Sequence, residues 1–228
     1  GQTRLELAKT NVSIVRSITE NIMKYAENPL LLVVSNPADI ITKAVQETSG
    51  LPANRVIGTG TSLDTARFRY NISTKLHVNV EDIQAYVVGE HGDSQVAVWS
   101  SAMVGGFPLE DYAKQVGVTL DKKEIAEHTK NGGAEVIGLK GATFYGIAMS
   151  VSNIVEAIMK DDSAILPAAC VLDESFGEWA GVAVSLPCRI GWEGIETCLR
   201  IPMNEEEQVA MNKSVAILKD FWAQVKEQ

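Results

Sequence analysis

The pentapeptide GEHGD, residues 89–93, holds the side chain best suited to acid–base chemistry in this sequence. His91 is one of three histidines in 228 residues, and it follows an apolar run over residues 83–88. We expect a strand there that gives way to a glycine-flanked turn, so that the imidazole can face a cavity. Because histidine titrates near neutral pH, such a ring can donate or accept a proton during a reaction. An ordinary loop histidine is the alternative.

The segment LDTARFR places Asp64 and Arg67 three positions apart, on one face of a predicted helix. A surface ion pair would explain them, and it would contribute at most about 1 kcal/mol. The apolar neighbours instead predict a well-buried helix, in which charges need partners: Leu63, Ala66, Phe68 and Tyr70. A buried carboxylate suits a histidine ring, and a buried arginine suits a substrate carboxylate held by two hydrogen bonds.

The triplet SNP places Asn36 between a predicted buried strand and a helix that Pro37 opens. Ligands of open α/β sheets bind outside the carboxyl ends of the strands. The Asn36 amide could therefore donate a hydrogen bond to a ligand oxygen, but capping of the helix is the simpler explanation. The roles of Glu90 and Asp93 are also open, since Asp93 could pair with His91 or only shape the turn.

The composition excludes several classes of function. The net charge is −9 and the pI is about 4.9, whereas nucleic acids and anionic membranes attract basic patches. No apolar run reaches the roughly 20 residues that cross a bilayer. The sequence shows neither metal-ligand spacing nor the GxSxG turn of a serine nucleophile. Three scattered cysteines favour a reducing, cytoplasmic compartment over a disulfide framework: Cys170, Cys188 and Cys198.

Apolar periodicity predicts helices in alternation with short strands. Helices are expected over residues 5–27, 37–48, 62–76, 121–160 and from 204 to the end, with breaks at 131–133 and 141. Strands are expected over residues 30–34, 56–58, 83–88, 96–99, 165–172, 180–188 and 194–201. The first helix should bury one face, and Ser62 should cap the third helix. That face comprises Leu5, Val12, Val15, Ile18, Ile22 and Tyr25.

These elements predict an α/β protein with two parts. The C-terminal remainder of a doubly wound parallel sheet would occupy residues 1–60. An α+β domain with antiparallel strands would occupy residues 61–228.

Five blocks in order carry a family resemblance: GQTRLEL (1–7), SNP (35–37), LDTARFR (63–69), GEHGD (89–93) and KGATFYGI (140–147). In residues and spacing they resemble the lactate/malate dehydrogenase family, over all 228 residues. The resemblance implies the end of a Rossmann domain, a catalytic domain and NAD as the cofactor. It also implies reversible hydride transfer between NADH and a 2-keto acid. Such enzymes are cytoplasmic, serve glycolysis and fermentation, and form homodimers or homotetramers.

The resemblance implies a role for each matching residue. His91 resembles the proton donor and acceptor, Asp64 the carboxylate that orients it, and Arg67 the group that binds the substrate carboxylate. Arg4 resembles the arginine of a closing loop that polarises the reacting carbonyl. Contacts are implied for Asn36 with substrate and nicotinamide, for Thr143 with substrate, and for Val34, Thr59 and Ile147 with the cofactor.

Two features favour pyruvate and lactate over oxaloacetate and malate. Leu5 follows Arg4 directly, where malate relatives tend to carry acidic residues, and Thr143 lies in the lactate-like segment GATFYG. Arg69 resembles one anion-binding position for fructose 1,6-bisphosphate, but Gln84 stands where a histidine is common, which weakens that expectation. Malate dehydrogenase, another 2-hydroxy acid dehydrogenase and an unrelated α/β binding protein remain alternatives.

The resemblance places the family's phosphate-binding glycine turn and its ribose-binding acid upstream of Gly1. A polypeptide that begins at Gly1 is therefore expected to bind NAD weakly and to turn over little. The strand over residues 30–34 would then have an unpaired edge. A catalytically inactive C-terminal fragment that persists by oligomerising is the corresponding alternative.

Overall fold

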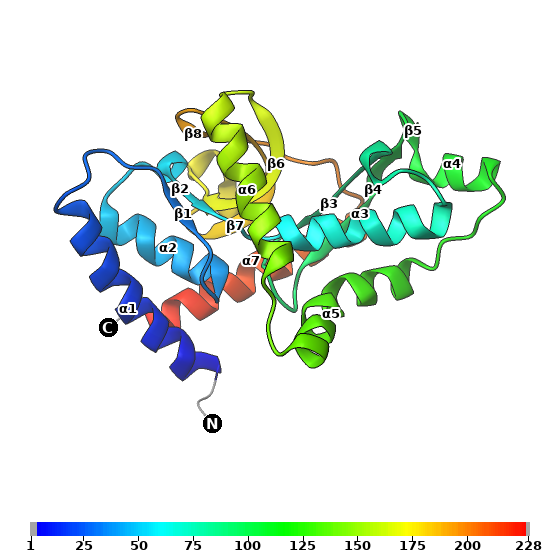
Figure 1. Ribbon diagram of the computed structural model, residues 1–228. Coiled ribbons are helices and arrows are strands. Elements are labelled where there is room, and N and C mark those ends of the chain that lie inside the picture. The colour runs from blue at the N-terminus through cyan, green and yellow to red at the C-terminus, as the bar shows by residue number, and fades with distance from the viewer. Residues whose placement is uncertain (1–3, 227–228) are drawn as a thin grey trace.

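The computed structural model describes residues 4–226. Figure 1 shows a larger lobe around a five-stranded sheet and a smaller lobe around a three-stranded sheet. The elements of the larger lobe are α1 (Arg4–Met23), β1 (Leu31–Val33), α2 (Ala38–Ser49), β2 (Val56–Gly58), α6 (Tyr145–Lys160), β6 (Ala164–Val171), β7 (Ala183–Gly191) and β8 (Gly194–Cys198). Those of the smaller lobe are α3 (Ser62–Leu76), β3 (Ile83–Val88), β4 (Val96–Val104), β5 (Phe107–Pro108), α4 (Leu109–Gln115) and α5 (Lys122–Lys140). The last helix, α7 (Glu205–Val225), contacts α1 and α2 as well as β4.

The large sheet has the strand order β1-β2-β6-β7-β8. β1 and β2 run parallel, and β2 then pairs antiparallel with β6 through Gly58 and Ala169. β6, β7 and β8 continue as antiparallel neighbours. The predicted α/β class with a parallel part and antiparallel strands is confirmed, although the three late strands extend the first sheet instead of forming one of their own. The domain boundary near residue 60 stays a prediction.

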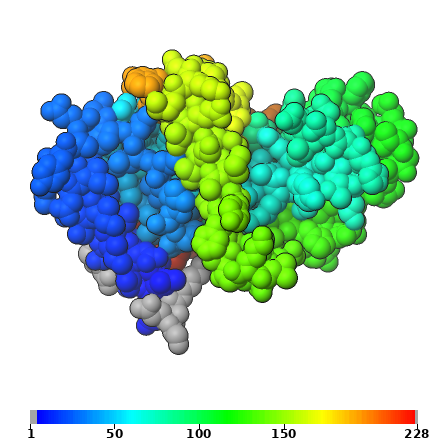
Figure 2. Space-filling model, viewed as in Figure 1, coloured from blue at the N-terminus to red at the C-terminus, as the bar shows by residue number. Residues whose placement is uncertain are grey.

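Apolar helix faces cover the large sheet. α2 buries Ile40, Ile41 and Val45 and packs on β2, β6 and β7. α6 buries Ile154 and Ala157 and contacts β7. In Figure 2, α6 forms a ridge between the α1–α2 side and the α3–α5 side of the molecule.

The smaller lobe has its own apolar core. Phe68 and Ile72 of α3 and Ile83 and Val87 of β3 are all fully buried in one cluster. The Phe68 ring meets Trp99 of β4 edge to face, with centroids 4.7 Å apart, a geometry that the ring quadrupoles favour. This packing fixes α3, which carries two of the candidate site residues, against β3, which leads into the third.

The first helix is shorter and less buried than predicted. α1 ends at Met23 instead of near residue 27. Val12 is buried, whereas Ile18 and Tyr25 are 51% and 89% exposed. Tyr25 lies beyond the helix end, so helical spacing no longer brings its side chain to the buried face.

Two local signals were misread. The pair Gly132-Gly133 does not break a helix: α5 continues to Lys140 and ends at Gly141, whose φ is +79°. Close packing explains the pair, since a Cβ on Gly132 would lie 3.0 Å from Cδ of Arg67. Ser62 does not cap α3 either, because it is the first helical residue and its hydroxyl donates to the carbonyl of Pro167.

α7 begins at the position that the sequence predicts, with Asn204 as its N-cap. The Asn204 side chain accepts a hydrogen bond from the Glu207 N–H at 2.9 Å, and the Glu207 carboxylate accepts one from the Asn204 N–H at 3.0 Å. This reciprocal arrangement is a capping box. The Glu207 carboxylate also accepts hydrogen bonds from the N–H groups of Trp99 and Ser100, at 2.8 and 3.0 Å. One buried carboxylate therefore both caps α7 and attaches it to β4.

We expect Glu207→Ala to lower the free energy of unfolding by about 3 kcal/mol, because it removes a cap and leaves two N–H groups of β4 without their hydrogen-bond acceptor. Asn204→Ala removes only the cap and should cost about 1 kcal/mol. Glu205→Ala, an exposed change in the same first turn, is the matched control and should cost only a few tenths of a kcal/mol. Urea unfolding measures all three, and equal losses for the two glutamate variants would contradict the double role of Glu207.

Candidate active site

Ser185, in the middle of β7, joins the segments that carry the candidate residues. Its side chain is fully buried, and its hydroxyl accepts a hydrogen bond from the Thr61 N–H at 3.0 Å. Its backbone exchanges two hydrogen bonds with Gly89, of 3.0 and 3.1 Å. The start of α3 and the end of β3 therefore meet at one point of the large sheet, and this brings Asp64 and His91 together.

Close packing around this point requires glycine at two positions. Gly60 has φ +44°, and a Cβ there would lie 2.0 Å from the Ser185 hydroxyl oxygen. Gly89 has φ +88°, and a Cβ there would lie 2.7 Å from the Ser214 hydroxyl oxygen of α7. Both combine a left-handed backbone with lack of space, which only glycine accommodates without strain. The first glycine of GEHGD is thus explained by the approach of α7.

Buried polar groups hold the loop that follows Gly89. The Glu90 N–H donates to the Ser214 hydroxyl at 2.8 Å. The Glu90 carboxylate accepts hydrogen bonds from the N–H and the hydroxyl of Ser94, at 3.2 and 2.5 Å. Asp93 forms an ion pair with Lys130 of α5 at 3.1 Å. Glu90 therefore shapes the turn around His91, and Asp93 attaches that turn to α5.

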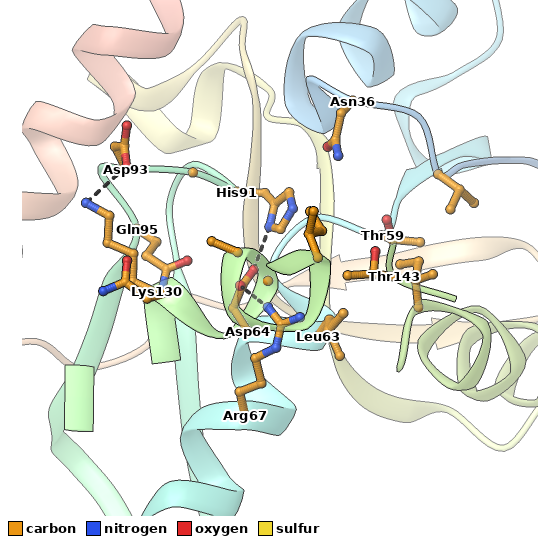
Figure 3. A pocket seen from close by; sticks show the side chains of 18 residues that line it. Asn36, Thr59, Leu63, Asp64, Arg67, His91, Asp93, Gln95, Lys130 and Thr143 are labelled. Carbon is orange, nitrogen blue, oxygen red and sulfur yellow. Dashed lines mark hydrogen bonds and ion pairs between the residues drawn. The ribbon is translucent and has the colours of Figure 1, made fainter. Parts of the chain in front are cut away.

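His91, Asp64 and Arg67 meet at the end of α3 nearest the large sheet (Figure 3). The His91 Nδ1 lies 2.6 Å from one Asp64 carboxylate oxygen, and the Arg67 Nη1 lies 3.5 Å from the other. The Asp64 side chain is only 3% exposed. The interpretation of Asp64 and Arg67 as a surface ion pair is therefore wrong, and the alternative of a buried pair with a histidine partner is confirmed.

The neighbours of this pair are less buried than the sequence predicted. Phe68 is fully buried, but Ala66 and Tyr70 are exposed on the other side of α3. Asp64 is shielded from water mainly by its position in the first turn of α3, against the end of β3.

Asp64 controls the protonation of His91. The hydrogen bond to the Asp64 carboxylate raises the pKa of His91 above its usual 6.5, and burial of the ring only partly opposes this. Since the carboxylate can only accept, Nδ1 carries the proton and Nε2 is left for a ligand. The ring is therefore held in one orientation, and its protonated form is favoured.

A cavity of about 540 Å³ opens around the His91 ring. It collects residues from segments far apart in the chain, and Figure 3 shows their side chains around one space. Every predicted substrate or cofactor residue with a described side chain lines it, beside Asp64 and His91: Val34, Asn36, Thr59, Arg67, Thr143 and Ile147. The Asn36 side chain does not cap α2, which begins after Pro37 without a side-chain cap, so the capping interpretation is wrong.

The glycine pair of α5 forms the wall beside Arg67. Cβ atoms on Gly132 and Gly133 would lie 3.0 and 3.6 Å from atoms of the Arg67 side chain. Larger residues on α5 would displace the guanidinium that lines the cavity. Sequence reasoning missed this role, although a glycine pair inside a helical pattern was the available signal.

Asp39 of α2 is a site residue that the sequence analysis did not assign. Its side chain is buried, and one carboxylate oxygen accepts a hydrogen bond from the His91 backbone N–H at 2.8 Å. The other oxygen has no hydrogen-bond partner among the described residues. Burial raises the pKa of Asp39 from 3.8 to about 7, although the bond from His91 favours the charged form. Asp39 thus positions the backbone of the loop that carries His91.

Three residues with predicted roles are not among the described residues that line the cavity. Arg4 begins α1, but its side chain lies outside the described residues. Arg69 donates to the carbonyl of Ala85 at 2.9 Å and stacks on the Tyr86 ring, and Gln84 is exposed on the neighbouring β3. The roles expected for Arg4, Arg69 and Gln84 stay predictions.

Comparison with known proteins agrees with this geometry. Residues 1–58 match the family model described as the NAD binding domain of lactate/malate dehydrogenase, and residues 61–228 match the model of its alpha/beta C-terminal domain. The chain belongs to the lactate/malate dehydrogenase family. The resemblance seen in the five sequence blocks is thereby confirmed, and NAD is the cofactor.

Several proteins that the chain resembles in sequence or structure are named L-lactate dehydrogenases. It is 41% identical over 224 residues to an L-lactate dehydrogenase of Acetivibrio thermocellus, in a match that covers 97% of this chain and 70% of that protein. It is similar in structure to the L-lactate dehydrogenase from Clostridium thermocellum, with TM-score 0.89 and 44% identity over all of this chain and 75% of the other. The minor L-lactate dehydrogenase from Enterococcus mundtii gives TM-score 0.93 and 38% identity over all of this chain and 73% of the other.

We expect Asp64→Asn to lower the pKa of His91, because the amide removes the negative charge that favours the imidazolium. An NMR titration of the His91 ring measures the change. An unchanged His91 titration would show that Asp64 does not control its protonation.

We expect Asp39→Asn to remove a pH dependence of stability. Because the folded pKa of Asp39 is about 7 and its usual value is 3.8, the unfolded chain ionises first. Stability is therefore lost as the pH rises from about 4 to about 7, by up to about 4 kcal/mol. In the variant, the amide oxygen that replaces the carboxylate can still accept from the His91 N–H, but the side chain does not ionise. Urea unfolding at several pH values should show the wild-type protein losing stability relative to the variant over this range, and Asp93→Asn, at an exposed position, should retain the wild-type trend.

Proposed function

We propose that this protein is an NAD-dependent L-lactate dehydrogenase that reduces pyruvate and, in reverse, oxidises lactate. The observation that carries the proposal is the constellation of Asp64, His91 and Arg67 on one cavity, with an acid–base group and an anion-binding group side by side. The names of the relatives support the substrate.

His91 acts as the proton donor. When pyruvate is reduced, negative charge develops on the keto oxygen, and a protonated His91 donates to that oxygen from Nε2. Asp64 stabilises the imidazolium before the transfer through its hydrogen bond to Nδ1. In the reverse direction the neutral ring accepts the hydroxyl proton of lactate. NADH supplies the hydride when it is bound.

Arg67 binds the substrate carboxylate. Its guanidinium has five N–H donors in a planar fork that matches a carboxylate, and Asp64 approaches it only at 3.5 Å. Several donors are therefore left for a ligand in the cavity. With the substrate carboxylate held there, the keto carbon lies beside His91, and Thr143 and the Asn36 amide are available to its other side. We propose that Arg4 closes over the carbonyl from the start of α1.

The cavity also fits one end of the cofactor. Val34 and Thr59 follow the parallel strands β1 and β2 at their carboxyl ends, where dinucleotides bind in this class of sheet. Ile147 of α6 lines the same cavity and offers an apolar surface to a planar ring. We propose that these residues and Asn36 hold the nicotinamide side.

The charges around His91 favour a monocarboxylate. With His91 protonated and Asp39 neutral below its pKa of about 7, two cations face the carboxylate of Asp64, which leaves a net charge of about +1 for one anion. Lys130 also lines the cavity, but it is paired with Asp93. Pyruvate carries one carboxylate, whereas oxaloacetate carries two, and among the described side chains that line the cavity no cation besides Arg67 and His91 is left for the second one. Malate chemistry is therefore the second candidate.

The assembly, the location and the metabolic role of the protein remain proposals. Exposed apolar side chains on α6 support assembly into homodimers or homotetramers: Tyr145, Met149 and Met159. None of the described helices combines the length and the hydropathy that a membrane span requires. Location in the cytoplasm and a role in glycolysis or fermentation stay predictions. Weak NAD binding and low turnover by a polypeptide that begins at Gly1 also stay predictions.

We expect His91→Asn in the full-length protein to lower kcat/KM for pyruvate by about 10²–10⁴-fold, because asparagine cannot transfer a proton. NADH consumption with pyruvate and with oxaloacetate measures both the loss and the substrate preference. The matched control is His128→Asn, at a histidine of α5 that is 59% exposed, and it should behave as the wild-type protein.

Two results would contradict the proposal. Faster consumption of NADH with oxaloacetate than with pyruvate would assign the protein to malate chemistry. An unchanged rate in His91→Asn would remove His91 from the reaction altogether.

A further inference from the structure

A cluster of three thiols lies in the large sheet, and the chemistry at His91 does not use it. The cysteines come from three consecutive strands of the sheet: Cys170 from β6, Cys188 from β7 and Cys198 from β8. Their sulfur atoms all lie within 4.8 Å of one another. Among the described residues, the cavity around His91 is lined by none of them.

The distances within the cluster suit bonds to one common atom. The Cys188 and Cys198 sulfurs are 3.7 Å apart, and those of Cys170 and Cys198 are 2.9 Å apart. Zinc–sulfur bonds of about 2.3 Å in a tetrahedron place two sulfurs about 3.8 Å apart. The first pair already has this spacing, and the second reaches it if the side chains separate by less than about 1 Å. The sulfurs of the third pair, Cys170 and Cys188, lie within 4.8 Å of each other.

The sheet holds these side chains in place. Cys188 and Cys198 face each other directly in the β7–β8 pairing, and both Cys170 and Cys188 are buried. Inert buried cysteines act as small apolar side chains and need no common partner. Here every cysteine of the chain converges on one point, although the sequence spacing contains no metal motif.

A second cavity gives access to the cluster. It has a volume of about 340 Å³, and Cys170 and Cys198 line it together with Asp173. An ion could therefore enter from solvent, and a water molecule or the Asp173 carboxylate could supply a fourth ligand. Three sulfurs with an open fourth position match a four-coordinate divalent ion better than Cu⁺, for which thiolates alone suffice.

We propose that Cys170, Cys188 and Cys198 form a three-thiolate site for a thiophilic divalent cation of the Zn²⁺ type, with its fourth position open to this second cavity. On binding, each thiol releases its proton to solvent as its sulfur–metal bond forms. The site joins three neighbouring strands, so bound metal would stabilise the folded protein.

The test uses the full-length protein, reduced and stripped of metal, and titrates it with Cd²⁺ without oxygen. We expect a thiolate-to-metal charge-transfer band in the ultraviolet that saturates at one ion per chain and that Zn²⁺ displaces. The same addition should raise the melting temperature and protect the three thiols from alkylation. Cys170→Ser, Cys188→Ser and Cys198→Ser should each lose most of the band. The matched control is His128→Asn, which removes a surface histidine that lies near Glu124 and Glu135, and it should keep the band.

Three results would overturn the proposal. The first is the absence of the band, with thiols that stay equally reactive in the presence of Cd²⁺. The second is uptake of Cu⁺ without uptake of Cd²⁺ or Zn²⁺, which would assign a different ion. The third is formation of a Cys170–Cys198 disulfide under mild oxidant in a protein that takes up no metal, which would make the cluster a redox pair. Because serine substitutions in a sheet can disturb folding, each variant is also compared with the metal-free protein by its melting temperature.

Discussion

The hydrogen bond between Asp64 and His91 is the interaction on which the site depends. A carboxylate almost sealed from water stays ionised only beside positive or hydrogen-bond-donating groups, and His91 and Arg67 provide them. The same bond fixes the ring orientation, selects the tautomer with a free Nε2 and raises the pKa of His91. The orientation of the imidazole and the direction of its pKa shift therefore both follow from one buried negative charge.

The rest of the fold holds the two partners at that distance. Asp64 is fixed because Thr61, one turn earlier, donates to Ser185, and His91 is fixed because Gly89 pairs with the same serine. A single residue of β7 thus sets the separation of two segments that are distant in the chain. The glycines at 60 and 89 are required because the backbone passes so close to the Ser185 and Ser214 hydroxyls. A side chain in place of either glycine would therefore shift Asp64 or His91 without contacting it.

The sequence predicted the fold class and picked out side chains that line one cavity, but it missed features that depend on tertiary contacts. Short sequence patterns were enough to identify Asp64, His91 and Asn36, because each lies either in a turn that follows a strand or on one face of a helix. Gly132 was misread as a helix break because only the position of Arg67, across the cavity, explains it. The three cysteines were not assigned to a site because only the pairing of β6, β7 and β8 brings them together. Asp39 was not assigned because its partner, the His91 backbone, follows β3 of the other sheet. The limits of helices depended likewise on contacts, as the exposed Tyr25 shows.

Asp39 links α2 of the larger lobe to the loop that carries His91. Val34, Asn36 and Thr59 belong to the large sheet and its loops, whereas Asp64 and Arg67 belong to α3 of the smaller lobe. The His91 loop connects them, since its backbone N–H donates to Asp39 of α2 while its ring donates to Asp64 of α3. Burial makes the charge on Asp39 costly, and the bond from His91 recovers only part of that cost. Asp39 is a buried acid that is costly to ionise, and it accepts a hydrogen bond from the backbone of His91, whose ring contacts α3. It therefore helps to fix where the imidazole lies relative to the end of the sheet.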